Sequence, residues 1–166
     1  MEYRKTNPTD SMDPLTQQEI KGLFSKKERR DLIVPNLSQI RWENLDFLGW
    51  RHRSGHLAFI VYQFDGNYKG LTLTLVDVTN RSATKMCSWC HTLHPGQGVT
   101  MFGAKTIANS RMLVANTACS DLQCSQYVRG LLKPDATQLQ ETIGAEEKIL
   151  RLRRNLDLFF QEVYGS

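Results

Sequence analysis

The sequence predicts an α+β fold with an N-terminal helix, a small antiparallel sheet, a segment organised by cysteines and a C-terminal helix. Complete helix-start signals at residues 15–20 predict the first element, and β-rich alternation from residue 57 predicts the sheet. An apolar period of 3.6 residues near the end of the chain predicts the last helix. Because 40% of the 166 residues are apolar, the chain can build a real core as one domain or two small lobes.

The N-terminal part is predicted to begin with a disordered lead-in. Residues 1–14 are polar, contain two prolines and show no periodicity. A helix then starts at Thr16, which is placed as an N-cap, and Glu19 completes a capping box three residues later. Leu15 is placed to contact Ile20 as a hydrophobic staple. The apolar stripe of this helix would consist of Ile20, Leu23 and Phe24.

The remainder of an N-terminal unit, residues 15–80, is expected to contain a β-hairpin. The aromatic and acidic stretch at 42–50 is interpreted as a short helix or turn that packs over the sheet. An apolar β-rich run covers 57–62, and apolar and polar residues alternate strictly over 71–75. Asp65-Gly66 between them predicts the hairpin turn. A further strand at 76–78 would either stand alone or continue the second strand.

The four cysteines of the chain form two close pairs, Cys87 with Cys90 and Cys119 with Cys124. Two such pairs can supply one tetrahedral thiolate site, for which Zn²⁺ is the usual ion. With four thiolates no ligand position is left for water, so the single zinc ion would be structural rather than catalytic.

Two disulfides or four unrelated buried thiols are the competing interpretations. The N-terminus lacks the apolar run of a signal peptide, and no segment approaches a membrane span, so we expect a reducing cytoplasm, which favours the metal. His91 and His94 follow the first pair and could substitute as ligands. With four cysteines available, they are interpreted as loop or surface residues.

Residues 81–134 are predicted to form a treble-clef zinc finger. Strands at 99–104 and 112–117, joined by a polar turn through Asn109 and Ser110, would return the chain to the first cysteine pair. A short helix at 121–131 would carry Cys124 at its N-terminus, where free amides and the helix dipole stabilise thiolates.

Residues 135–166 are predicted to form a C-terminal helix that packs back on the core. The helix would start near Gly144, with Glu147 at its third position and an ion pair between Glu147 and Arg151. We expect it to pack against the N-terminal helix or the sheet. Its apolar stripe would consist of Ile149, Leu152, Leu156, Phe159 and Val163.

The cysteine motifs resemble a known family. The stretches Met86-Cys-Ser-Trp-Cys-His-Thr-Leu-His-Pro-Gly-Gln-Gly-Val99 and Cys119-Ser-Asp-Leu-Gln-Cys-Ser-Gln-Tyr-Val-Arg-Gly130 are similar to the elongation factor G-binding proteins of the FusB type. The resemblance implies a cytoplasmic bacterial protein that binds elongation factor G on or near the ribosome. In resistance-conferring members it also implies release of a factor stalled by fusidic acid.

The resemblance places the zinc ligands on the four cysteines and partner contacts on aromatic and basic residues around them. Trp89 and Arg111 are candidate anchors, since Trp and Arg dominate the energetics of interfaces. The alternative for Phe102 and Tyr127 is packing within the zinc lobe. The candidate partner contacts are Trp89, Phe102, Lys105, Arg111, Tyr127 and Arg129.

Three classes of function remain open at this point. The first is a monomeric interaction module without chemistry of its own. The second is an RNA- or ribosome-binding zinc protein, which the net charge of +4 permits; Trp89 would stack on a base and the phosphate contacts would be Lys85, Lys105, Arg111 and Arg129. The third is a nuclease using His91 and His94, which the four-cysteine site disfavours because catalysis needs an open metal position.

Overall fold

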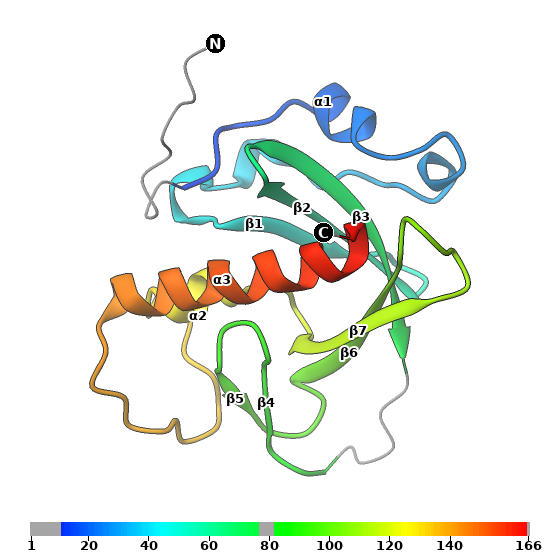
Figure 1. Cartoon of the computed structure of the whole chain (residues 1–166). Helices are drawn as coiled ribbons and strands as arrows, with labels where there is room; N and C mark the ends of the chain where they lie inside the picture. The colour runs from blue at the N-terminus through cyan, green and yellow to red at the C-terminus, as the bar shows by residue number, and fades with distance from the viewer. Residues whose placement is uncertain (1–10, 77–81, 166) are drawn as a thin grey trace.

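The computed structural model describes residues 11–76 and 82–165 (Figure 1). The helices are α1 (Gln17–Gly22), α2 (Cys124–Val128) and α3 (Ala145–Tyr164), with short 3₁₀ helices η1 (Glu28–Arg30), η2 (Leu37–Gln39) and η3 (Trp42–Asn44). The strands are β1 (Phe47–Arg51), β2 (Leu57–Phe64), β3 (Asn67–Val76), β4 (Lys85–Met86), β5 (Leu93–His94), β6 (Val99–Lys105) and β7 (Leu113–Cys119). The predicted α+β class is confirmed.

A five-stranded antiparallel sheet in the order β1-β2-β3-β6-β7 forms the centre of the molecule. The hairpin between β2 and β3 is the predicted one. Asp65 and Gly66 both have positive φ, 51° and 77°, as a tight two-residue loop between twisted strands requires. β3 continues to Val76, and the rest of the predicted 76–78 strand lies outside the described residues.

Alternation along β2 divides the core into two clusters on opposite faces of the sheet. Ala58, Ile60 and Tyr62 belong to one cluster, whereas Phe59 and Val61 belong to the other. Successive side chains of a strand point to opposite faces, so a run buried throughout needs a cover on both sides. The sheet is therefore the middle layer of the protein (Figure 1).

The N-terminal segment covers the face of the sheet that carries Phe59 and Val61. The capping box of Thr16 and Glu19 is confirmed, but α1 ends at Gly22, so the predicted stripe residues Leu23 and Phe24 lie at and beyond its end. The predicted lead-in differs from the structure where it is described. Met12 is buried because its side chain joins the hydrophobic cluster between the N-terminal segment and the sheet. The Met12 N–H also donates to the Leu45 carbonyl at 2.9 Å.

Helix α3 lies across the other face, opposite α1 (Figure 1). All five predicted stripe residues are buried, and Glu147 accepts a hydrogen bond from the Gly144 N–H at 3.0 Å. The predicted pairing of Glu147 with Arg151 is wrong. Arg151 instead pairs with Glu141 of the preceding loop, Nη2 to Oε1 at 3.1 Å, while Glu147 caps the helix.

The interpretation of residues 42–50 as a helix or turn is wrong in its second half. Only Trp42–Asn44 is helical, and Phe47–Arg51 forms the edge strand β1, because its residues pair with β2 from Phe47↔Tyr62 to Arg51↔Ala58. The strands of the cysteine segment also join the main sheet, through Thr74↔Gly103 and its neighbours. The sheet therefore continues across the predicted boundary at 80/81, with β3 before it and β6 after it.

Candidate metal centre

The four cysteines converge on one buried point. Cys87 and Cys90 lie in the loop between β4 and β5, Cys119 is the last residue of β7, and Cys124 is the first residue of α2. Their Sγ atoms all lie within 4.8 Å of one another, and all four residues are buried. The antiparallel β6–β7 hairpin and the turn after it thus return the second pair to the first, as the spacing predicts.

The distances between the sulfur atoms fit a tetrahedral metal ion. Sγ atoms are 3.7 Å apart for Cys87 and Cys124, and 3.5 Å apart for Cys90 and Cys119. Zn–S bonds of about 2.3 Å in a tetrahedron place sulfurs about 3.8 Å apart. None of the cysteines is bonded to another, so the disulfide alternative is not the one the structure adopts.

The electrostatics of the site also call for a cation. Burial raises the pKa of the Cys124 thiol well above its ordinary value when no metal is bound. Four thiolates can therefore share this pocket only around an ion that offsets their charge. The donor set is the one that structural zinc takes, and its four positions leave none for a substrate.

The loop that carries the first pair is shaped by its backbone. The Cys87 N–H donates to the Thr92 carbonyl at 2.9 Å, and the His91 N–H donates to the Cys87 carbonyl at 2.9 Å. The Cys90 N–H points at the Cys87 sulfur at 3.4 Å. His91 closes the turn with a φ of 62° and is not a ligand, in agreement with its interpretation as a loop residue.

His94 is a site residue that sequence reasoning missed. Rather than lying in a loop or on the surface, it is buried in β5, with Nε2 3.2 Å from the Cys119 sulfur and its ring edge-on to Tyr127. Gly98 makes room for it, since a Cβ there would be 2.4 Å from the His94 Cβ. The sequence feature that could have indicated this role is the alternation of Thr92 and His94, two polar residues just after the first cysteine pair that both face inward.

Trp89 and Phe102 are core residues rather than exposed partner contacts. Trp89 is fully buried, with its ring 5.8 Å from Phe47 and 5.4 Å from Phe159. Phe102 is fully buried as well, in agreement with the alternative that it packs the lobe. Trp89 lies between Cys87 and Cys90 in the tight turn beneath α3, and this turn directs the Trp89 side chain into the core.

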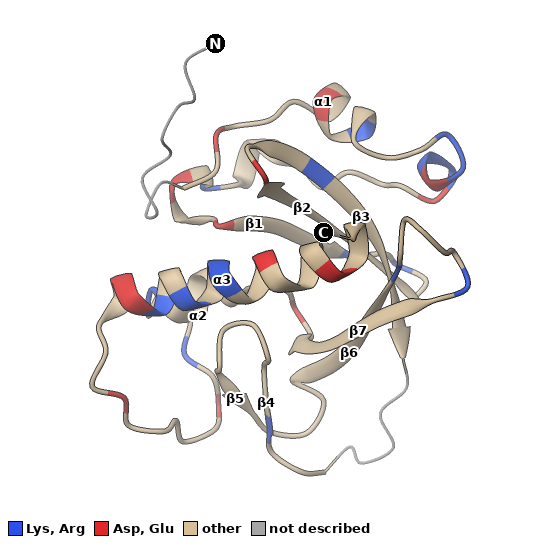
Figure 2. Ribbon diagram, viewed as in Figure 1, with Lys and Arg blue, Asp and Glu red and all other residues tan. Residues whose placement is uncertain are grey.

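Arg129 and Tyr127 also have partners within the chain. Arg129 Nη1 forms an ion pair with Asp46 at 2.6 Å, so the guanidinium that is predicted to contact a partner also has a role within the chain. The Tyr127 hydroxyl donates to Asp121 at 2.7 Å. Lys105 and Arg111 are the predicted contacts that remain exposed, at the β6–β7 hairpin (Figure 2).

The comparisons with known proteins agree with this geometry. A family model described as the FBP C-terminal treble-clef zinc-finger matches residues 23–163. A solved structure of the fusidic acid resistance protein FusC superposes with a TM-score of 0.62 at 16% sequence identity. The superposition covers 93% of this chain and 60% of that one, so the chain spans about three fifths of its length. No curated protein matches the sequence.

The family match extends over most of the chain and includes all four cysteines. The likeness to FusC, which covers 93% of this chain at 16% identity, shows a shared fold. In the described residues, no helix is long and apolar enough to cross a membrane. The chain belongs to the FBP C-terminal treble-clef zinc-finger family, the FusB-type family that its cysteine motifs resemble.

Proposed function

We propose that this protein binds elongation factor G in the cytoplasm and acts as a translation accessory factor without chemistry of its own. The observation that carries the proposal is family membership over residues 23–163, supported by a fold shared with a fusidic acid resistance protein. A buried four-sulfur site supports the absence of catalysis, because it leaves no open position on the metal.

The metal would act by holding the lobe together. Structural zinc sites contribute apparent binding free energies of about 10 to 16 kcal/mol, comparable to the whole stability of a domain. Cys119 ends β7 and Cys124 starts α2, so the ion joins the sheet to the segment that packs on α3.

The β6–β7 hairpin is the surface we assign to the factor. Ile107, Met112 and Leu113 are 62%, 59% and 52% exposed, and Lys105 and Arg111 flank them. Apolar residues surrounded by polar ones are the usual anatomy of a protein interface. The Ile107 N–H donates to the Val163 carbonyl of α3 at 2.8 Å, which fixes the hairpin to the body.

Binding at this hairpin would favour one conformation of the factor over another. A ligand shifts such an equilibrium only by the difference between its affinities for the two states. We propose that the protein has the higher affinity for the factor as it leaves the ribosome, which would promote release in the manner of fusidic acid resistance.

RNA binding is the second candidate, and one observation favours it. Lys26, Lys27, Arg29 and Arg30 are exposed around η1, while Glu28 is bonded inward to the Ser25 N–H and the Thr72 hydroxyl (Figure 2). Such a cluster could contact phosphates. The buried Trp89 is not available for base stacking, so this candidate rests on charge alone.

Titration calorimetry of the zinc-loaded protein with purified elongation factor G tests the proposal. Met112→Ser should weaken binding, whereas Leu158→Ser, a matched change at a 53% exposed position of α3, should not. Binding that persists at high salt supports the apolar hairpin. No heat of binding to the factor, together with salt-sensitive binding of ribosomal RNA, would replace the proposal with the second candidate.

A further inference from the structure

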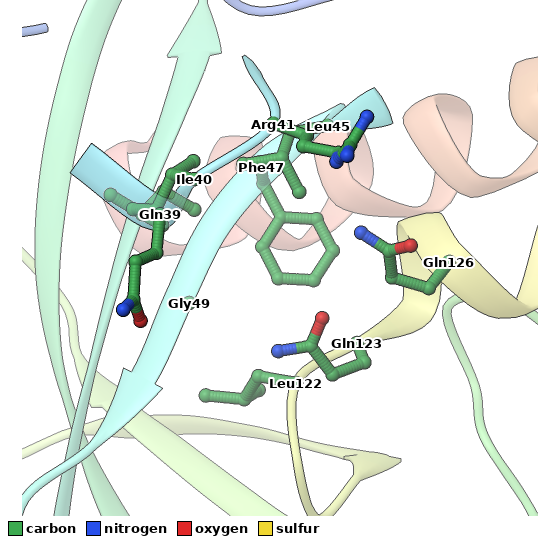
Figure 3. A pocket seen from close by; sticks show the side chains of 10 residues that line it. Gln39, Ile40, Arg41, Leu45, Phe47, Gly49, Leu122, Gln123 and Gln126 are labelled. Atoms are coloured by element: carbon green, nitrogen blue, oxygen red, sulfur yellow. The ribbon is translucent and has the colours of Figure 1, made fainter. Parts of the chain in front are cut away.

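A groove runs beside the free edge of the sheet, next to the metal centre. It has a volume of about 280 Å³ and lies between the η2–η3 segment and the turn that leads into α2 (Figure 3). We define the edge groove by six of its residues: Gln39, Arg41, Gly49, Leu122, Gln123 and Gln126.

Strand β1 forms the floor of the edge groove and presents unpaired backbone groups to it. The His52 N–H donates to the Leu57 carbonyl. In the antiparallel register, the N–H and C=O groups of Trp50 and Leu48, which alternate with His52, therefore point toward β2. Phe47, Gly49 and Arg51 therefore turn their N–H and C=O groups outward. Within residues 11–76 and 82–165, no strand pairs with this edge.

One wall of the groove is held in a strained conformation. Leu122 has a φ of 56°, which costs a leucine about 1 to 3 kcal/mol. It is buried against Gly49, where a Cβ would be only 2.9 Å from the Leu122 Cβ. Gly49 therefore allows the wall to approach the strand closely. Because Leu122 lies between Cys119 and Cys124, a metal held by the four cysteines would keep this wall in place.

The side chains around the groove can recognise an extended chain. Figure 3 shows the amides of Gln123 and Gln126 turned toward the ring of Phe47. Together with Gln39 they offer donors and acceptors that have no partner in the described part of the chain. Arg41 is the single charged residue of the lining, is exposed and has no ion-pair partner among the described residues.

We propose that the edge groove binds an extended acidic peptide segment of a partner protein, which adds as a strand to β1 and places a carboxylate on Arg41. The mode is β-augmentation, in which an exposed sheet edge supplies the main-chain bonds and neighbouring side chains select the sequence. The positive charge of Arg41, with no acidic residue in the lining, specifies an acidic segment. This inference goes beyond the proposed function and does not depend on it.

Amide spectra of the ¹⁵N-labelled, zinc-loaded protein test the inference. The probe is a pool of blocked five-residue peptides with Glu at the centre and Thr or Val elsewhere. One matched pool carries N-methyl groups on alternate amides, and another has Lys in place of Glu. With the first pool, the Gly49 and Arg51 amides should shift and exchange at least about tenfold more slowly, as amides entering a ladder do.

The two matched pools and two variants complete the test. The N-methylated pool should not bind, and the Lys pool should bind more weakly than the Glu pool. Arg41→Gln should weaken binding of the Glu pool by up to about fivefold, the size of an exposed ion pair. Arg154→Gln, at an exposed residue of α3 outside the lining, should leave peptide binding unchanged. Equal binding of the N-methylated pool, no shift at Gly49 at millimolar peptide, or a stronger response of Gly49 and Arg41 to a uridine oligomer would each overturn the proposal.

Discussion

The carboxylate of Asp46 lies 2.6 Å from the guanidinium of Arg129, and this pair connects the edge strand of the sheet to the metal lobe. Asp46 directly precedes β1, and Arg129 directly follows α2. Arg153 of α3 joins the same carboxylate at 2.8 Å. The Asp46 N–H also donates to Ser125 at 2.9 Å, so three separate segments meet at one buried acid.

Asp46→Asn should destabilise the protein by about 3 to 5 kcal/mol, because it removes the charge shared by two largely buried arginines. The side chain of Asp46 is fully buried, and those of Arg129 and Arg153 are 13% and 17% exposed. Urea unfolding measures the loss, and Asp31→Asn, at an exposed aspartate, is the matched control. A loss below 1 kcal/mol would mean that the three segments are held by packing alone.

Cys119→Ser should abolish metal retention and binding of elongation factor G together. The Cys119 sulfur lies 3.5 Å from that of Cys90 and anchors the end of β7 to the site. Removing one of four ligands leaves three thiolates in a buried pocket, which costs most of the metal binding free energy. Metal content by atomic absorption and calorimetry with the factor measure the two effects. A folded variant that binds the factor without metal would contradict a structural role for the ion.

Trp89→Ala should lower the free energy of unfolding by about 3 to 5 kcal/mol, because the indole fills the core between the sheet and α3. The ring contacts Phe47 on β1 and Phe159 on α3, and the Trp89 carbonyl accepts a hydrogen bond from Asn155 at 2.9 Å. Chemical denaturation measures the change, with Trp89→Phe expected to lose less. Unchanged stability with weaker binding of the factor would restore Trp89 as a partner contact.

The parts of the fold that could be predicted are those determined by local signals. The capping box at Thr16, the turn at Asp65-Gly66 and the stripe of α3 each depend on neighbouring residues, and each is confirmed. The four-cysteine site was equally predictable, because two close cysteine pairs are typical of a zinc site and the hairpin expected between them can bring the pairs together.

What could not be predicted depends on contacts between distant segments. Strand β1 was missed because Phe47–Arg51 becomes a strand only by pairing with β2. Arg129 is of a residue type that is common at interfaces, and its ion pair with Asp46 could not be predicted because Asp46 lies 83 positions earlier in the chain. His94 likewise needs Cys119 across the site before its role is visible.

His94→Gln should weaken zinc binding by about 10- to 100-fold, the usual effect of removing a group that supports a metal ligand. The imidazole Nε2 lies 3.2 Å from the Cys119 sulfur, where an N–H can stabilise the thiolate that the metal requires.

His94 is buried against Tyr127, so the variant is tested beside His94→Ala, which adds a cavity, and His91→Gln, which changes a non-ligand of the same loop. Competition with a chromophoric chelator measures zinc affinity for each variant. Because a glutamine amide can still donate a hydrogen bond, His94→Gln should retain more affinity than His94→Ala. If His91→Gln lowers the affinity as much as either, the effect comes from the shape of the loop rather than from the contact with Cys119.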